Sequence, residues 1–252
     1  MLTFVTWKWR GHAGQPYQAW HVNAMVEQLH DRVRLPHRTI CITDDPDGIV
    51  CETFPLWEDH AELRQVLTPK LPSCWRRLKL FDSRTTKQLG IADGEMVASL
   101  DLDLVFVRDA TKFFDRPDDF CAWKRHAPDQ PVSYCAAVLM FRAGTMDYLW
   151  HGFRPSQIRR IRNLGYRGSD QGWISYVLKG RYPGWQEQVD GIYSFSIWDK
   201  YAASPDDLPA NAIVVAFNGR KGKPWDREVI DAYPWIRQHW QRDSLVAGHY
   251  RL

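Results

Sequence analysis

Cysteine, net charge and long apolar runs are all scarce in this 252-residue chain. The five cysteines are scattered and form no Cys-x-x-Cys pair, which argues against a disulfide framework and against a zinc site. The net charge of +3 is too small for nucleic-acid binding driven by phosphate charge. No apolar run approaches the roughly 18 residues of a membrane span. We therefore expect a cytoplasmic protein that binds no nucleic acid, either free or peripheral at the inner face of the membrane.

Internal repeats, low-complexity tracts and linker-like segments are also lacking. We expect one domain over residues 1–252, with an aromatic and basic tail from about residue 227 packed on it. The abundant residue is tryptophan, which occurs 13 times. Because tryptophan fills protein cores and also stacks on sugars and bases, its number alone does not choose between these uses.

The start of the chain predicts a strand over 2–9, a helix over 17–29 and a strand over 38–43, ended by the turn Asp44–Gly48. Strand, helix and strand in this order form the βαβ unit of a parallel sheet, with loops at the carboxyl ends of the strands. Further elements are a helix over 71–81, strands over 96–100, 132–141 and 212–217, and a helix that begins near 168–172. The sequence therefore predicts an α/β fold with a mostly parallel central sheet flanked by helices.

Asp101 and Asp103 follow the apolar strand Met96–Leu100 and are the most informative pair in the chain. Residues two apart on a strand point to the same face, so the two carboxylates are expected to project together. Two unpaired carboxylates on an apolar strand would cost several kcal/mol in desolvation, which a divalent cation relieves. Oxygen ligands suit Mg²⁺ or Mn²⁺. The alternative is a pair of carboxylates at a strand end that cap turns or form salt bridges.

The segment Asn218–Trp225 is a glycine-rich basic loop after the last predicted strand. Gly219 and Gly222 allow backbone N–H groups to approach an anion, and Lys223 adds a positive charge for phosphate. Read alone, the segment has a solvated basic turn as its alternative. Beside a metal site, it is a natural partner for a diphosphate.

Three residues at the end of the first strand, Thr6, Trp7 and Lys8, lie where a nucleotide base is expected in such a sheet. Trp7 is a candidate for stacking on uracil, and a core position is the alternative. Asp170 and Gln171 follow Gly168 and Ser169 in a turn that enters a helix. A carboxylate there has a simpler reading as a helix cap worth ~1 kcal/mol.

The order of Asp101-Leu-Asp103, Asp170-Gln171, Phe217-Asn-Gly219 and Lys223-Pro-Trp225 resembles the nucleotide-sugar glycosyltransferases of the GT-A fold. The pattern is most similar to family 8 relatives from bacterial surface-polysaccharide systems, and it covers most of the chain. The resemblance implies a GT-A-like single domain that transfers a sugar from a UDP or similar donor to a hydroxyl of a glycan or lipid-linked glycan, with retention of configuration.

The resemblance also implies roles for particular residues. It assigns a divalent metal, Mn²⁺ or Mg²⁺, to Asp101 and Asp103, and it assigns the Asp170–Gln171 pair to the donor sugar. Lys223 and Lys79 are expected to face the diphosphate. For Lys79 the alternative is a solvated lysine on a helix.

The chain departs from the family pattern near the expected third metal ligand. Relatives usually have a histidine just before the phenylalanine of the loop, where this chain has Ala216, and some have it just after, where this chain has Asn218. The third ligand is therefore Asn218, His239, His249 or water. In the strand near residue 135, relatives have an asparagine before a small residue, whereas this chain has Cys135-Ala-Ala137. The resemblance therefore implies that a polar contact to the donor sugar is lost.

Two other functions remain open. A non-catalytic protein that binds carbohydrate or nucleotide-sugar on the same fold is favoured by the missing histidine and the many aromatic residues. A nucleotidyltransferase ranks last, because the segment Gly11–Gly14 is too short for the glycine-rich loop of that class and lacks its basic pattern.

Overall fold

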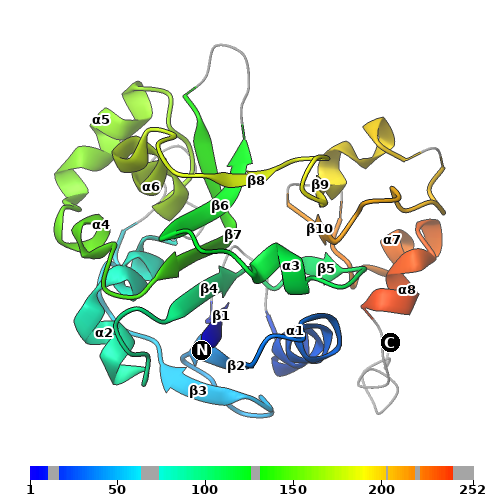
Figure 1. Cartoon of the computed structure of the whole chain (residues 1–252), viewed down its shortest axis with the longest axis horizontal. Coiled ribbons are helices and arrows are strands. Elements are labelled where there is room, and N and C mark those ends of the chain that lie inside the picture. The colour runs from blue at the N-terminus through cyan, green and yellow to red at the C-terminus, as the bar shows by residue number, and fades with distance from the viewer. Residues whose placement is uncertain (11–16, 64–73, 126–130, 203, 219–221, 241–252) are drawn as a thin grey trace.

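Seven strands form the main sheet of the computed structural model, in the order β3–β2–β1–β4–β7–β6–β8 (Figure 1). Their bounds in chain order are β1 Leu2–Lys8, β2 His37–Thr43, β3 Glu52–Pro55, β4 Met96–Leu100, β6 Phe120–Arg125, β7 Ser133–Arg142 and β8 Gly184–Gln186. The structure describes all residues except 11–16, 64–73, 126–130, 203, 219–221 and 241–252. β7 is antiparallel to both of its neighbours, and the other neighbouring pairs are parallel. The prediction of an α/β fold with a mostly parallel central sheet is therefore confirmed.

The central strand β1 shows why the sheet needs cover on both faces. All seven of its residues are buried, and β1 pairs with β2 on one side and β4 on the other. Val5 and Trp7 belong to one apolar core, whereas Leu2 and Phe4 belong to the core on the opposite face. Alternate residues of a strand point to opposite faces, so one strand contributes to two cores.

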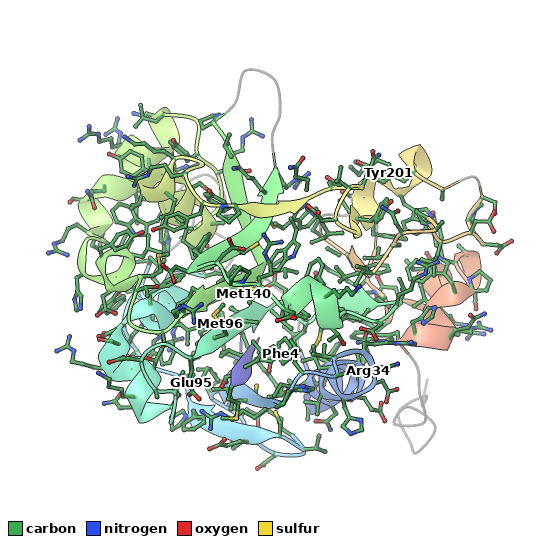
Figure 2. The ribbon with its side chains drawn as sticks, viewed as in Figure 1. Phe4, Arg34, Glu95, Met96, Met140 and Tyr201 are labelled. Atoms are coloured by element: carbon green, nitrogen blue, oxygen red, sulfur yellow. The ribbon has the colours of Figure 1, made fainter. Side chains whose placement is uncertain are left out.

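Helices cover the two faces of this sheet (Figure 1). One core packs residues of α1 and α3 on the sheet, and the other packs residues of η2, α4 and α6. Figure 2 shows Phe4, Met96 and Met140 in the middle of the molecule, where these elements converge. The helical elements are α1 Ala19–Arg32, η2 Trp75–Phe81, α2 Ser83–Gln88, α3 Thr111–Phe114, α4 Asp147–His151, η3 Pro155–Gln157, α5 Ile158–Asn163, α6 Asp170–Leu178, η4 Phe195–Lys200, α7 Arg227–Ala232 and α8 Trp235–His239.

A second, three-stranded sheet has the order β5–β10–β9, formed by Leu104–Phe106, Val214–Ala216 and Ile192–Ser194. β10 is antiparallel to β5 and parallel to β9. Residues of α7 and α8 pack with this sheet in a third apolar core, so the described part of the predicted tail, residues 227–240, lies against it.

Three local expectations need correction. The segment Asp101–Asp103 is a turn between β4 and β5 and does not continue the strand, so strand alternation is not what brings its carboxylates together. The helix expected over 71–81 is the 3₁₀ helix η2, which begins at Trp75, and residues 71–73 lie outside the described chain. The first helix begins at Ala19 and ends at Arg32, and its apolar face, which includes Val22, Met25 and Leu29, is buried. No described helix is both long enough and apolar enough to cross a bilayer.

Candidate active site

The turn Asp101–Asp103 carries the chain from the main sheet into the second sheet. The Asp101 N–H donates to the Ala137 carbonyl of β7 at 2.9 Å, and the Asp103 carbonyl accepts from the Phe217 N–H at 2.8 Å. These bonds fix the turn between the two sheets. The side chain of Asp101 is 30% exposed, whereas that of Asp103 is 10% exposed.

Arg77 of η2 connects Asp101 with the start of α6. Its guanidinium is 4% exposed and donates from Nη1 to Asp101 Oδ1 at 2.5 Å and from Nη2 to the Ala136 carbonyl at 2.5 Å. Nε lies 3.0 Å from Asp170 Oδ2, an ion pair without the angle of a hydrogen bond. Arginine suits this place because its rigid fork of donors reaches several acceptors at once.

Sequence reasoning missed Arg77. The residue stands in the basic run of Arg76, Arg77 and Lys79, and nothing in that run distinguishes the buried member from the others. The available signal was its spacing of three and four residues from Leu80 and Phe81, which places it on the apolar side of a helical turn. A charged residue on such a face needs a buried partner of opposite charge.

Asp170 is the first residue of α6, and its side chain is buried. Ser169 Oγ donates to Asp170 Oδ1 at 3.3 Å and accepts from the Cys74 N–H at 2.8 Å. Burial raises the pKa of the Asp170 carboxyl, and the Arg77 charge opposes that rise. For Arg77 itself burial lowers the pKa, but the Asp170 and Asp101 carboxylates outweigh it and the net shift is upward.

Lys223 pairs with the second acid of the turn. Its Nζ lies 2.5 Å from Asp103 Oδ2 and donates to the Phe217 carbonyl at 2.8 Å. Burial raises the pKa of Asp103, Lys223 lowers it, and the nearby Asp101 charge raises it further. Gly222 precedes Lys223 with φ +122°, and a Cβ there would lie 2.3 Å from a Val229 methyl. The position therefore requires glycine, and the close approach sets where Lys223 leaves the loop.

The five charged groups form one network with an excess of negative charge. Asp101, Asp103 and Asp170 carry three negative charges, and Arg77 and Lys223 carry two positive charges, which leaves one net negative charge.

Tyr17 lies next to this network. Burial raises the pKa of its phenol, and the Asp103 and Asp101 charges raise it further, so the phenol stays protonated at neutral pH.

The residues expected at the nucleotide base are buried and satisfied in this structure. Thr6 Oγ1 donates to the Ile40 carbonyl at 3.2 Å, and Lys8 Nζ pairs with Asp45 Oδ2 at 2.8 Å. Trp7 is 1% exposed, its Nε1 donates to Ser99 Oγ at 2.8 Å, and the Arg77 guanidinium lies 5.7 Å from the centre of its ring. Trp7 thus supports Arg77 from within the core. Stacking on a base stays a prediction.

The remaining candidates are spread around the network. Lys79 Nζ lies 2.5 Å from Asp59 Oδ2, and no described contact joins it to the network. Asn218 Oδ1 accepts from Ser194 Oγ at 2.6 Å, and Ala216 is fully buried in β10. The Gln171 side chain lies against Gly168.

Three of the predicted residues lie elsewhere or outside the described chain. His239 lies on α8, where Nδ1 is 3.2 Å from Arg32 Nη2. Gly219 and His249 lie outside the described residues.

The metal prediction is not confirmed. Among the described residues, no group of three or more histidine, cysteine, aspartate or glutamate side chains is arranged to hold a metal ion. The two acids of the turn supply oxygen ligands only, and each faces a protein cation.

No family model and no curated relative matches this chain. Its fold is similar to that of solved glycosyltransferases. The galactosyltransferase LgtC, solved with donor and acceptor sugar analogues, matches with a TM-score of 0.59 at 14% identity over 96% of this chain and 98% of that one. The bifunctional glycosyltransferase WbbM matches with a TM-score of 0.58 at 11% identity over 94% of this chain and 49% of that one. Mouse xyloside xylosyltransferase 1 matches with a TM-score of 0.51 at 10% identity over 85% of this chain and 97% of that one. The chain therefore has the fold of these glycosyltransferases, as the resemblance to the GT-A group implied.

Proposed function

We propose that this protein is a glycosyltransferase that transfers a sugar from a nucleoside diphosphate donor, UDP first among them, to a hydroxyl of a glycan or lipid-linked glycan. The observation that carries the proposal is the buried network in which Arg77 joins Asp101 to Asp170 while Lys223 pairs with Asp103. The network lies where β4 ends. The carboxyl ends of strands are the usual ligand positions of open α/β sheets.

The acids of the turn suit a divalent cation in charge and in ligand type. Arg77 pairs with Oδ1 of Asp101 and Lys223 pairs with Oδ2 of Asp103, which leaves the second oxygen of each carboxylate outside these two ion pairs. We propose that Asp101 and Asp103 hold Mn²⁺ or Mg²⁺ through these oxygens, with Asn218 as the third ligand. When bound, the cation neutralises charge on a diphosphate. To coordinate the cation through Oδ1, Asn218 would have to give up the hydrogen bond that this oxygen accepts from Ser194 Oγ.

The remaining residues have distinct tasks in the proposed reaction. Lys223 donates from Nζ to the leaving diphosphate, where negative charge develops as the bond to the sugar breaks. Asp170, held by Arg77, supplies negative charge near the anomeric carbon or orients the sugar hydroxyls. Gln171 is proposed beside it; an active-site mutant of LgtC replaces glutamine by glutamate. Retention of configuration remains a prediction, because one buried carboxylate in this position serves either stereochemistry.

The second candidate is a non-catalytic protein that binds a nucleotide-sugar. The specific observation in its favour is that both turn acids already pair with protein cations. In addition, Ala216 stands where the family pattern implied by the resemblance has a histidine. Such a protein would bind the donor and leave it intact.

The test is ligand-induced stabilisation followed by turnover. UDP, GDP, ADP and CDP are each added with and without Mn²⁺ while the melting temperature is recorded, since ligand that binds only the folded state raises it. The corresponding UDP-sugars are then assayed for release of UDP. Asp101→Asn and Asp103→Asn should each abolish the Mn²⁺-dependent shift, whereas Asp115→Asn, at an exposed acid that follows α3, should retain it.

The possible results separate the candidates. A shift with UDP release supports the transferase, and a shift without release supports the binding protein. Equal binding of UDP and Mn²⁺ by the parent and both turn variants would contradict the metal assignment. No shift with any nucleotide would contradict both functions.

A further inference from the structure

Helix α5 and the residues on either side of it contain several arginines that have no acidic partner. Between Asp147 and Asp170 the sequence contains no acidic residue. The same stretch contains five arginines, which we call the α5 basic surface: Arg154, Arg159, Arg160, Arg162 and Arg167. Arg162 is half-buried and the other four are exposed. None of the five forms an ion pair with any described residue.

Exposed arginines elsewhere often pair with aspartate, as Arg34 does with Asp109, Arg84 with Asp82 and Arg227 with Asp231. Arg10, Arg125 and Arg181 are exposed and form no ion pair with a described residue, so single unpaired arginines are not unusual here. The α5 basic surface differs because five arginines follow one another in a stretch without any acidic residue. Like charges that gather without counter-charges repel each other and favour an anionic partner. Among the described residues, the Arg154 guanidinium, for example, donates to the His151 and Phe153 carbonyls and to no carboxylate.

The local fold points these charges outward. Ile158 and Ile161 of α5 are buried, and the helix packs against α6, so the intervening Arg159 and Arg160 face solvent. Figure 1 shows α5 at the outer edge of the molecule, on the side away from α7 and α8. Leu164, the residue that follows α5, is 50% exposed, and Tyr148 of α4 is also exposed. An apolar side chain among unpaired arginines suits the boundary between lipid headgroups and acyl chains.

We propose that the α5 basic surface binds a membrane surface that contains anionic phospholipids. Each arginine contributes charge attraction to the headgroups, and Leu164 enters the interface. The same segment continues through Arg167 to Asp170, so docking by this surface would bring the candidate site close to acceptors held in the membrane. The proposal does not depend on the proposed function, because it concerns lipid binding without a donor.

The experiment is flotation of the full chain with vesicles of phosphatidylcholine alone and of phosphatidylcholine mixed with phosphatidylglycerol. The expected result is binding to the mixed vesicles only, which weakens as ionic strength rises. Each basic residue near an anionic surface contributes about fivefold in affinity, so the triple variant Arg159→Gln, Arg160→Gln, Arg162→Gln should lose on the order of a hundredfold. Leu164→Gln should lower the affinity for the mixed vesicles by only several-fold, and it should leave the salt dependence of binding unchanged.

A matched control removes the same charge from other faces. The variant Arg34→Gln, Arg84→Gln, Arg227→Gln should bind the mixed vesicles as the parent does, within a few-fold. Unfolding in urea verifies that both triple variants are folded. No vesicle binding by the parent, or equal loss in both triple variants, would overturn the proposal. Binding to heparin in the absence of vesicle binding would overturn it as well and would assign the surface to an anionic glycan.

Discussion

Replacing Arg77 by methionine should destabilise the protein strongly, because it leaves two carboxylates without their shared cation. Arg77 donates to Asp101 and to the Ala136 carbonyl and forms the ion pair with Asp170, all from a side chain that is nearly inaccessible to water. Breaking a buried ion pair by removal of one partner typically costs ~3–5 kcal/mol. A hydrogen bond to a charged group alone accounts for ~1.5–3 kcal/mol, so the estimate is consistent with losing the contacts at both acids.

The assay is urea unfolding followed by far-ultraviolet circular dichroism, with the free energy of unfolding extrapolated to water. Arg227→Met is the control, because Arg227 forms an exposed pair with Asp231 of a kind worth ~0–1 kcal/mol. Adding Asp170→Asn to Arg77→Met should recover part of the loss, since one buried charge is then removed. An Arg77→Met protein as stable as the control would refute the conclusion that this guanidinium stabilises the fold by pairing with Asp101 and Asp170.

Three further outcomes are expected. Lys223→Ala should lower turnover by about 2–3 kcal/mol in the barrier with little change in sugar affinity, and unchanged kcat would assign Lys223 to a structural pair only. Asn218→His should raise Mn²⁺ affinity about tenfold in a titration with UDP present, whereas Ala216→His should first cost ~1–3 kcal/mol of stability, because Ala216 is fully buried. Burial lowers the pKa of His21 to about 4, so the unfolded chain binds more protons between pH 4 and 6.5 and stability should fall as pH falls through that window. His21→Gln should reduce this loss, and equal acid sensitivity in parent and variant would contradict the assignment.

The sequence by itself determined the arrangement of the main elements. The spacing of apolar residues located β1, α1 and β2, and the order of strand, helix and strand implied a parallel sheet whose loops meet at one edge. The sequence also indicated the candidate site residues. A charged residue directly after an apolar strand or in a glycine-containing turn can be recognised from the linear sequence, as for Asp101, Asp103, Asp170 and Lys223. Hydrophobic periodicity is a property of a short segment, so the linear sequence is sufficient to recognise it.

Only the tertiary structure decided how those charges are satisfied. Arg77 meets Asp101 and Asp170 across separations of 24 and 93 positions, and Lys223 meets Asp103 across 120. Such pairs depend on how η2, α6 and the loop after β10 pack around the end of β4. Tertiary packing also buried Trp7, for which the sequence left both a core position and stacking open, and it gave Asn218 Oδ1 a hydrogen bond from Ser194 Oγ. Sequence patterns predict which groups are charged, whereas the free energy of burying a charge depends on the partner that the fold brings to it.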